Sequence, residues 1–599
     1  MSILQSLDRY YDRMAARGEA EPQGYSREKI SFAVLLSPDG KPTHVRDLRR
    51  QEGRKPLPAL LAVPSLPGKR TVAIVPNMLW DKTAYVLGCT AGEGRRTALE
   101  HERFKLENHA LVRGSNDLGL IAFAHFLETW RPEHFGAAPF SRDMLDTNIV
   151  FALDGDRQYL HEREAARRLL ATARAGGDVP VRTCLVTGME APVARLHPQI
   201  KGVDGAQTSG AALVSFNLDA FTSYNNAQGD NAPTSEEAAF RYGQALNRML
   251  DRGGKNRLPR TIGDATVVFW ADTSEAVDET QAEAAETNFA WLISPPEDDS
   301  ERAKLSDRLH DLMRGRPLSE LDPKVVPGTR FHVLGLSPNA ARLSVRFWLT
   351  DSIDAFAARL AQHHADLAVD PLPWHKPPSL HYLLLKTSAL QQKPENVPPL
   401  LAGEVMRAIL SGGLYPRTWL AAAIARLRAG DDPSTGWHAA AIRAVLARQS
   451  RFAQGAAPPM SLNRESEDPA YNCGRLFATL ETAQRSALGG TVNATIRDRY
   501  MGAASATPAS VFPLLIKNAQ NHLSKLRKDG KGGWIERELD EIQDKFAFTE
   551  QGGYPRSLKL EQQGRFFLGY YHQRKAQFVK AKQHGETITA DEETAGNGQ

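Results

Sequence analysis

The stretch FHVLGLSPNAARLSVRFWL, residues 331–349, marks the point at which the pattern of the chain changes. Residues 331–336 and 341–349 are largely apolar, and Ser337-Pro338-Asn339 between them is typical of a turn, so the stretch predicts a β-hairpin. After Ser352 the spacing of Ala, Leu and Arg follows the helical period. The hairpin therefore separates a strand-rich part of the chain from a helical one.

The part before the hairpin predicts short strands with helices between them, but without the regular alternation of a doubly wound sheet. The predicted strands are residues 30–36, 43–48, 71–75, 85–90, 148–153, 182–187, 213–217 and 266–270. Residues 272–301 are rich in Asp and Glu and are predicted to be a solvated excursion from the fold.

The part after the hairpin predicts helices only, with a Pro- and Gly-containing break at residues 454–459. The predicted helices are residues 355–364, 403–410, 417–429, 437–449, 471–487, 495–506, 511–528, 534–547 and 557–581. Since 599 residues exceed what one hydrophobic core supports, we expect several domains. The fold class is predicted as α+β, with a mixed N-terminal domain at 1–350, a helical region at 351–458, a C-terminal helical bundle at 459–584 and a disordered acidic tail at 585–599.

Composition excludes several classes of protein. The net charge of +4 is too small for binding through the overall field, so any nucleic-acid contact must come from local patches. Cys89, Cys184 and Cys473 are far apart, which argues against a disulfide framework or a cysteine-based zinc site. Residues 1–18 predict an amphipathic helix, not a signal peptide, and no apolar run is long enough to span a membrane. We expect a cytoplasmic protein.

Two polar loops precede a predicted helix at residues 238–251. The first, Gly202–Gly210, is rich in glycine, but it lacks the Gly-Lys-Ser/Thr ending of a nucleoside-triphosphate loop and leads into a predicted strand. The second, residues 221–233, is dense in amides and ends at the capping box Thr234-Ser-Glu-Glu237. Amide side chains can read the edges of bases, although Asn, Gly and Pro are also ordinary turn residues.

Asp219, Asp264 and Asp272 lie near predicted strand ends, where carboxylates could hold a metal ion for phosphodiester cleavage. Nothing in the sequence fixes their mutual spacing, and the histidines lack metal-ligand spacing. We therefore expect no catalytic residues, no metal and no cofactor, with a metal-dependent nuclease as the alternative.

The last predicted helices carry clusters of cations at Lys525, Arg527, Lys528 and Lys531 and at Arg574 and Lys575. Aromatic residues at 566, 567, 570 and 571 are interleaved with them. Cations with aromatics suit single-stranded nucleic acid, because phosphates need positive charge and unstacked bases need flat surfaces. A solvated helix face over core aromatics would show the same pattern.

Several stretches, in this order, resemble the large subunit of the subtype I-C CRISPR Cascade over about 570 residues. They are LQSLDRYY at 4–11, VPNMLWDK at 75–82, YVLG at 85–88, residues 210–217 and 221–233, FHVLGLSPN at 331–339, residues 342–348, YNCGRL at 471–476 and residues 564–574.

The resemblance implies a non-catalytic subunit of an RNA-guided antiviral complex. Guide RNA would supply the target sequence, while this chain reads a protospacer-adjacent motif (PAM) in double-stranded DNA, a short thymine-rich one such as TTC. It would also help to open the duplex and stabilise the R-loop. Its expected partners are the guide-RNA ribonucleoprotein, the backbone and guide-5′-end Cascade subunits, small-subunit copies, target DNA and a recruited helicase-nuclease.

The family-like stretches supply candidate contacts with nucleic acid. Those for the motif are Asn77, Lys82, Lys201, Gln207, Tyr224, Asn225, Gln228 and Asn231. Those for the displaced strand and phosphates are Lys525, Arg527, Lys528, Lys531, Arg574 and Lys575. The resemblance also implies that the small subunit is an internal translation product of the same gene, for which Met460 is a plausible start. A purely structural scaffold that does not contact DNA is the third hypothesis.

Overall fold

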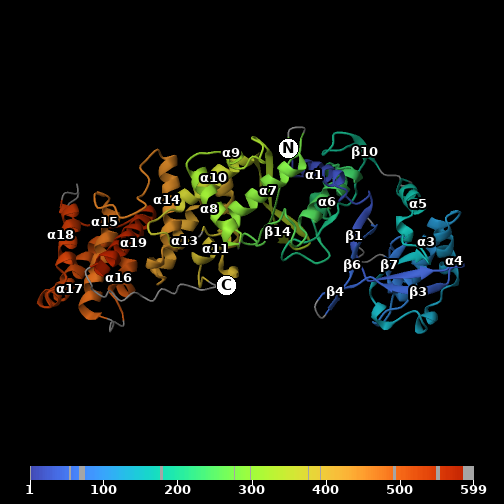
Figure 1. Ribbon diagram of the computed structural model, residues 1–599, viewed down its shortest axis with the longest axis horizontal. Coiled ribbons are helices and arrows are strands. Elements are labelled where there is room, and N and C mark those ends of the chain that lie inside the picture. Colours follow the sequence, from blue (N-terminus) through green and yellow to red (C-terminus); the bar gives the residue numbers. More distant parts are fainter. Residues whose placement is uncertain are drawn as a thin grey trace. The chain divides into compact units, whose positions relative to one another are not determined.

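The computed structural model of the chain (Figure 1) describes residues 2–52, 55–65, 74–175, 180–274, 277–296, 298–375, 377–391, 393–489, 494–547 and 553–583. The chain forms two compact units. The first consists of Met1–Arg252 with Asn339–Ser344, and the second of Gly253–Pro338 with Val345–Gln599. The domain boundaries predicted near 350 and 458 fall inside the second unit and stay predictions.

The first unit is built around a four-stranded sheet in the order β3-β2-β8-β7. Its strands are β2 (Phe32–Leu36), β3 (Pro42–Asp47), β7 (Trp80–Lys82) and β8 (Asn148–Leu153). Strands β2 and β8 are parallel, and the other two pairs are antiparallel. All five residues of β2 are buried, which explains why this strand is a continuous apolar run in the sequence.

Three helices accompany this sheet: α2 (Thr83–Val86), α3 (Thr97–Val112) and α4 (Leu118–Thr129). Phe123 and Phe126 of α4 pack on Phe151 of β8, with ring centroids 4.8 and 5.2 Å apart. The strand predicted at 85–90 is wrong, because the backbone makes the short helix α2 and then turns. A short apolar run does not distinguish a strand from a buried helical turn.

The rest of the first unit pairs the two ends of its sequence. Helix α1 (Ile3–Ala16), predicted from its amphipathic period, is confirmed and packs on α6 (Glu236–Met249). Arg241 joins the two helices, because its guanidinium bonds the Asp8 and Asp12 carboxylates at 2.6 Å each. Strand β1 (Tyr25–Ile30) pairs antiparallel with β6 (Ala59–Pro64).

Shorter elements complete this unit. They are β4 (Arg50–Glu52), β5 (Lys55–Leu57), α5 (Glu164–Ala175), β9 (Val181–Thr183), β10 (Glu190–Pro192), β11 (Gln199–Ile200), β12 (Ala211–Ala212) and the 3₁₀ turns at 132–136, 142–144, 160–162, 219–221 and 228–231. The strand predicted at 182–187 is confirmed only at its start, and residues 213–217 form no strand, since β12 ends before them. Most of the strand predicted at 71–75 lies outside the described residues.

The predicted hairpin is confirmed as β14 (Arg330–Asn339) and β15 (Arg342–Ser352), with β13 (Thr266–Ala271) antiparallel to β14. The turn predicted at Ser337-Pro338-Asn339 is wrong, because these residues continue β14 and the chain turns at residues 340–341. Helices α7 (Glu279–Ile293), α8 (Asp299–Met313) and α9 (Leu318–Leu321) connect β13 to β14. The solvated excursion predicted at 272–301 is therefore wrong. Phe289 of α7 is fully buried. The acidic residues around it in the sequence led to the prediction of a solvated segment.

The remainder of the second unit is helical, as predicted. Its helices are α10 (Ile353–Leu367), α11 (Leu380–Lys386), α12 (Pro399–Ser411), α13 (Arg417–Arg428), α14 (Trp437–Phe452), α15 (Pro469–Leu488), α16 (Ile496–Ala504), α17 (Pro508–Lys528), α18 (Gly533–Ala547) and α19 (Leu560–Gln583). One hydrophobic core extends from β13 to α19, and the α+β fold class is confirmed. The predicted acidic tail lies outside the described residues.

Helices α15 and α19 cross with their backbones in close contact. A Cβ added at Gly474 would overlap the carbonyl oxygen of Phe566, and one at Gly569 would overlap that of Tyr471. Only glycine allows two helices to approach this closely. The family-like stretches at 471–476 and 564–574 therefore contain the small residues of a helix crossing.

Candidate nucleic-acid interface

The amide-rich segment at residues 217–233, here called the amide loop, is the clearest exposed polar feature of the first unit. It connects β12 to α6 and contains two single 3₁₀ turns. The Tyr224 side chain is 96% exposed, and Asn225 is exposed beside it. An aromatic ring held fully in solvent buries nothing within this chain, so it is available to a partner.

The backbone of the amide loop is held in a costly conformation. Tyr224, Asn225 and Gln228 have φ angles of 51°, 60° and 52°, in the left-handed region that non-glycine residues seldom adopt. The peptide turns tightly there, with a bridge between Ser223 and Asn226. Such strain persists only where surrounding contacts impose it, and it is common at binding sites.

Asn231 provides much of that constraint. Its amide nitrogen donates to the backbone carbonyls of Asn226 and Gln228, both at 3.0 Å, and its Oδ1 accepts from the Ser223 N–H at 3.0 Å. Although the sequence places Asn231 among the motif-reading candidates, its hydrogen bonds are made within the loop. It is positioned to shape the loop that presents Tyr224 and Asn225.

Residues distant in sequence anchor the amide loop. The Arg182 guanidinium lies 3.5 Å from Asn226 Oδ1 and 3.7 Å from Asp230. Arg342, at the tip of the β14–β15 hairpin, donates to Asn217 Oδ1 at 2.5 Å and lies 4.5 Å from the Phe221 ring centroid. Sequence reasoning missed these two arginines, because no local motif links them to the loop.

The end of the amide loop is anchored where α6 begins. The Ser235 N–H donates to Cys184 Sγ at 3.1 Å, and the Ser235 hydroxyl caps the helix by accepting from the Ala238 N–H. Burial acts to raise the pKa of the Cys184 thiol, but hydrogen bonds with Ser235 and Thr187 lower it to about 7. Cys184 is therefore a buried anchor with a polarised sulfur.

The other motif candidates lie apart from the amide loop in sequence and in their contacts. Asn77 is buried, with its N–H bonded to Asp81 and its carbonyl to Asn108 of α3, so it supports β7. Lys82 and Gln207 are exposed, and Lys201 pairs with Glu28 of β1 at 3.0 Å. These contacts do not join the eight candidates into one continuous surface.

Helix α17 presents a polar face in the second unit. Lys525, Arg527 and Lys528 in its last turn and Lys531 after it are all exposed. Arg527 pairs with Glu536 at 2.5 Å, whereas no carboxylate among the described residues pairs with Lys525, Lys528 or Lys531. Lys517, Asn518 and Asn521 are exposed on the preceding turns of the same helix.

The second cation cluster differs from the first. Arg574 and Lys575 of α19 are half-buried, with Arg574 bonded to the Thr482 hydroxyl at 3.2 Å and the Lys575 ammonium 5.8 Å from the Tyr571 ring centroid. The possibility that the neighbouring aromatics stack on bases is wrong. Those aromatics, Phe566, Phe567, Tyr570 and Tyr571, are at most 1% exposed and belong to the core.

The carboxylates considered for a nuclease have separate surroundings. Asp264 pairs with Arg346 at 2.5 Å and Asp272 with His332 at 3.1 Å in the second unit, while Asp219 is exposed in the amide loop. Within the described ranges, no three His, Cys, Asp or Glu side chains gather as a metal site would require. No described helix is long and apolar enough to cross a membrane.

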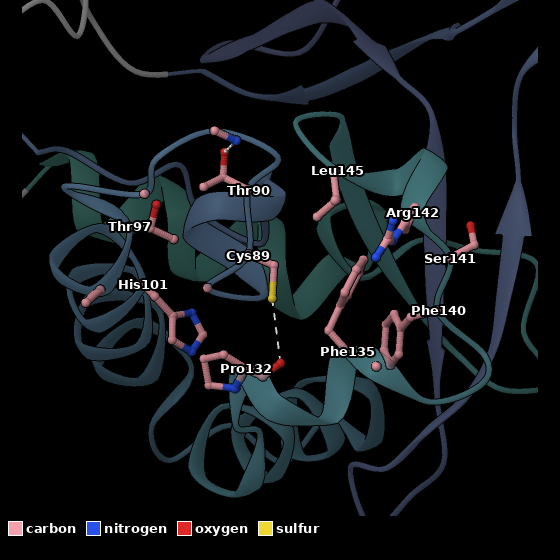
Figure 2. Close-up of a pocket in the computed structure, with 15 residues that line it drawn as sticks. Cys89, Thr90, Thr97, His101, Pro132, Phe135, Phe140, Ser141, Arg142 and Leu145 are labelled. Atoms are coloured by element: carbon pink, nitrogen blue, oxygen red, sulfur yellow. Dashed lines mark hydrogen bonds between the residues drawn. The ribbon is translucent and has the colours of Figure 1, made fainter.

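The first unit also contains a pocket of about 800 Å³ that sequence reasoning missed (Figure 2). Its walls come from residues 88–101 and 132–145, between the end of α2 and the start of β8. The local signal was Gly92-x-Gly94 three residues before Thr97, a glycine-rich loop that opens onto a helix N-terminus. This loop was not recognised as the start of a helix, because residues 85–90 were wrongly predicted to form a strand.

Together, the fold and these surfaces define a two-unit α+β protein that presents amides on one unit and lysines on the other. Residues 7–578 match the family model described as CRISPR-associated protein (Cas_Csd1). The chain therefore belongs to the Cas_Csd1 family of CRISPR-associated proteins, which confirms the predicted family at that level. No curated protein matches the chain.

Proposed function

We propose that this chain is the large subunit of a subtype I-C Cascade and that it reads the protospacer-adjacent motif through the amide loop. The observation that carries the proposal is the exposed, strained turn at Tyr224 and Asn225, held by Asn231. A rigid turn lowers the entropy lost on binding, and amides recognise base edges. The chain itself would be non-catalytic and cytoplasmic.

In this proposal the lysines at the end of α17 bind phosphates. Lys525, Lys528 and Lys531 are exposed and have no carboxylate partner among the described side chains, so they are free to neutralise a displaced strand. Phosphate contacts position a protein on DNA, whereas base contacts specify the sequence. The guide-RNA ribonucleoprotein, the other Cascade subunits and a recruited helicase-nuclease would complete the R-loop machinery.

The small subunit would arise from an internal start at Met460. This residue is 54% exposed and lies between α14 and α15, so a product beginning there keeps α15–α19, including the glycine crossing. Mass spectrometry of the purified complex should show a fragment that begins at Met460. A complex with the full chain alone would remove this part of the proposal.

The test of motif reading uses a pair of substitutions at one position. Asn225→Gly keeps the left-handed backbone accessible while removing the amide, and Asn225→Ala removes the amide and strains the backbone. Bound to guide RNA and the other subunits, both variants should lose discrimination between duplexes that differ only in the motif. Full discrimination by Asn225→Gly would show that the amide of Asn225 does not read the motif.

A further inference from the structure

Three aromatic side chains of the second unit meet where α11 contacts α14 (Figure 1). Trp437 is the first residue of α14. Its ring centroid lies 5.3 Å from that of Tyr382 in α11 and 5.1 Å from that of Trp374, which precedes α11. These three residues are here called the aromatic surface, since the contacts between their rings join them into one feature.

The aromatic surface is anchored on one side and open on the other. Trp374 and Trp437 are half-buried and pack against the hydrophobic core of the second unit. Tyr382 is 41% exposed, so much of its ring remains in contact with solvent. A ring that its neighbours already hold in place loses little conformational freedom when a flat group stacks on it. The surface is therefore suited to binding a planar ligand.

Two cations lie beside the aromatic surface. The Lys386 ammonium, one turn further along α11, is 5.3 Å from the Tyr382 ring centroid. At the start of α11, the His381 Nδ1–H donates to the Thr261 carbonyl at 3.2 Å. Burial lowers the pKa of His381, and the positive charge of the exposed Arg260 lowers it further, so this arginine is close to the helix. Neither cation forms an ion pair with a described carboxylate.

This combination of groups suits single-stranded nucleic acid. Unpaired bases stack on aromatic rings, and cations beside the rings neutralise phosphates. Asp431 and Asp432, in the turn before α14, are already paired with arginines and add no free negative charge. Aromatic rings can also bind a cationic ligand, but Lys386 would repel it. The pattern that the sequence predicted at α19, where the aromatics belong to the core, is found at this surface instead.

We propose that the aromatic surface binds single-stranded nucleic acid, with a base stacked on Tyr382 and an adjacent phosphate bound by Lys386. The lysine side chain is flexible, so its ammonium can move from the ring to a phosphate while a base takes its place. Arg260 would neutralise a further phosphate. The strand would be DNA or RNA, because stacking does not distinguish them. This inference depends neither on motif reading by the amide loop nor on the lysines of α17.

The experiment measures the binding of labelled dodecamers to the full chain by fluorescence anisotropy. A deoxyuridine dodecamer should bind at least about fivefold more tightly than an abasic dodecamer with the same phosphates, because stacking contributes only to the first. Tyr382→Leu should weaken deoxyuridine binding about tenfold and leave abasic binding unchanged. Tyr382→Phe, which keeps a ring, should bind like the parent chain. Lys386→Gln should flatten the salt dependence by about one counterion.

Phe452→Leu is the matched control. Phe452 is 57% exposed, but it lies at the opposite end of α14 from Trp437, about 22 Å along the helix axis. This variant should bind both dodecamers like the parent chain. The effect of Tyr382→Leu should persist when the three exposed lysines at the end of α17 are replaced with Gln. Tyr382→Leu should also keep the parent melting temperature, because the ring that it removes is at the surface.

A uridine dodecamer distinguishes the two sources of the strand, since it differs from the deoxyuridine dodecamer only in its 2′-hydroxyls. Tighter binding of deoxyuridine assigns the surface to DNA, and tighter binding of uridine assigns it to RNA, provided that Tyr382→Leu weakens the tighter complex. The proposal is overturned if the abasic dodecamer binds as tightly as deoxyuridine, or if Tyr382→Leu binds both strands like the parent. Binding of a proline-rich peptide that Tyr382→Leu abolishes, with no effect on either strand, would assign the surface to a protein partner instead.

Discussion

The amide loop and the α15–α19 crossing both lie in stretches that resemble the same protein family, yet the loop is exposed to solvent and the crossing belongs to the core. The amide loop leaves Tyr224 in solvent and bends through left-handed residues. The crossing is mostly buried and depends on Gly474 and Gly569 for backbone contact. Resemblance in sequence therefore marks surface and core alike, and only the geometry separates a binding segment from a packing one.

The largest expected effect tests the crossing. Gly569→Ala should lower the free energy of unfolding of the second unit by about 3 kcal/mol, because the new Cβ overlaps a carbonyl oxygen that cannot move alone. Gly403→Ala in α12 is the control, since nothing lies within 4 Å of its added Cβ, and it should stabilise by up to about 1 kcal/mol. Thermal unfolding followed by circular dichroism checks both. Equal melting temperatures would show that the helices do not cross so closely.

The next largest expected effect is the loss of stability of the two units at acidic pH. Burial lowers the pKa of His161 and His197 in the first unit and of His572 in the second to about 4. Between pH 6.5 and 4 the unfolded chain binds more protons than the folded chain. The free energy of unfolding therefore decreases as the pH is lowered, by about 2 kcal/mol for each histidine at pH 5. Calorimetric scans at pH 7.5 and 5 should show this loss. His161→Gln should reduce the pH dependence, whereas a change at the exposed His44 should not.

The amide loop should respond in specificity, not in stability. Asn225→Gly or Gln228→Gly should reduce motif discrimination by about 1 to 3 kcal/mol while leaving the melting temperature unchanged. Asn231→Leu should also reduce it, because three hydrogen bonds that shape the turn are lost. Competition binding with matched duplexes measures the ratio. If Asn231→Leu discriminates like the parent chain, the turn is not preorganised by that residue.

The smallest effect per residue concerns the cations. Replacing Lys525, Lys528 and Lys531 with Gln should weaken DNA binding equally for all motifs and flatten its salt dependence, since each lost phosphate contact releases about one counterion fewer. The half-buried pair Arg574 and Lys575 should have less influence on the slope. Affinities over a range of salt concentrations check this. A larger effect from the α19 pair would reverse the assignment.

Sequence reasoning predicted the hairpin from two neighbouring apolar runs, and the helical half from its long, regular helical period. It missed α7, although Asp278-x-x-Gln281 forms a capping box before that helix, because acidic residues hid the buried Phe289. It also placed Asn77 and Asn231 with the exposed candidates. The contacts that decide otherwise are the hydrogen bond from the Asn108 amide to the Asn77 carbonyl and those from Asn231 to the carbonyls of Asn226 and Gln228. They come from tertiary folding or from backbone groups, which have no sequence signal.

The most direct measurement is the binding of the guide-RNA complex, with and without this chain, to matched duplexes that differ only in the motif. The proposed function predicts that the chain confers motif-dependent binding without cutting, and that the Asn225→Gly chain restores binding but not discrimination. Unchanged binding and discrimination in the absence of the chain would contradict it and leave a structural role.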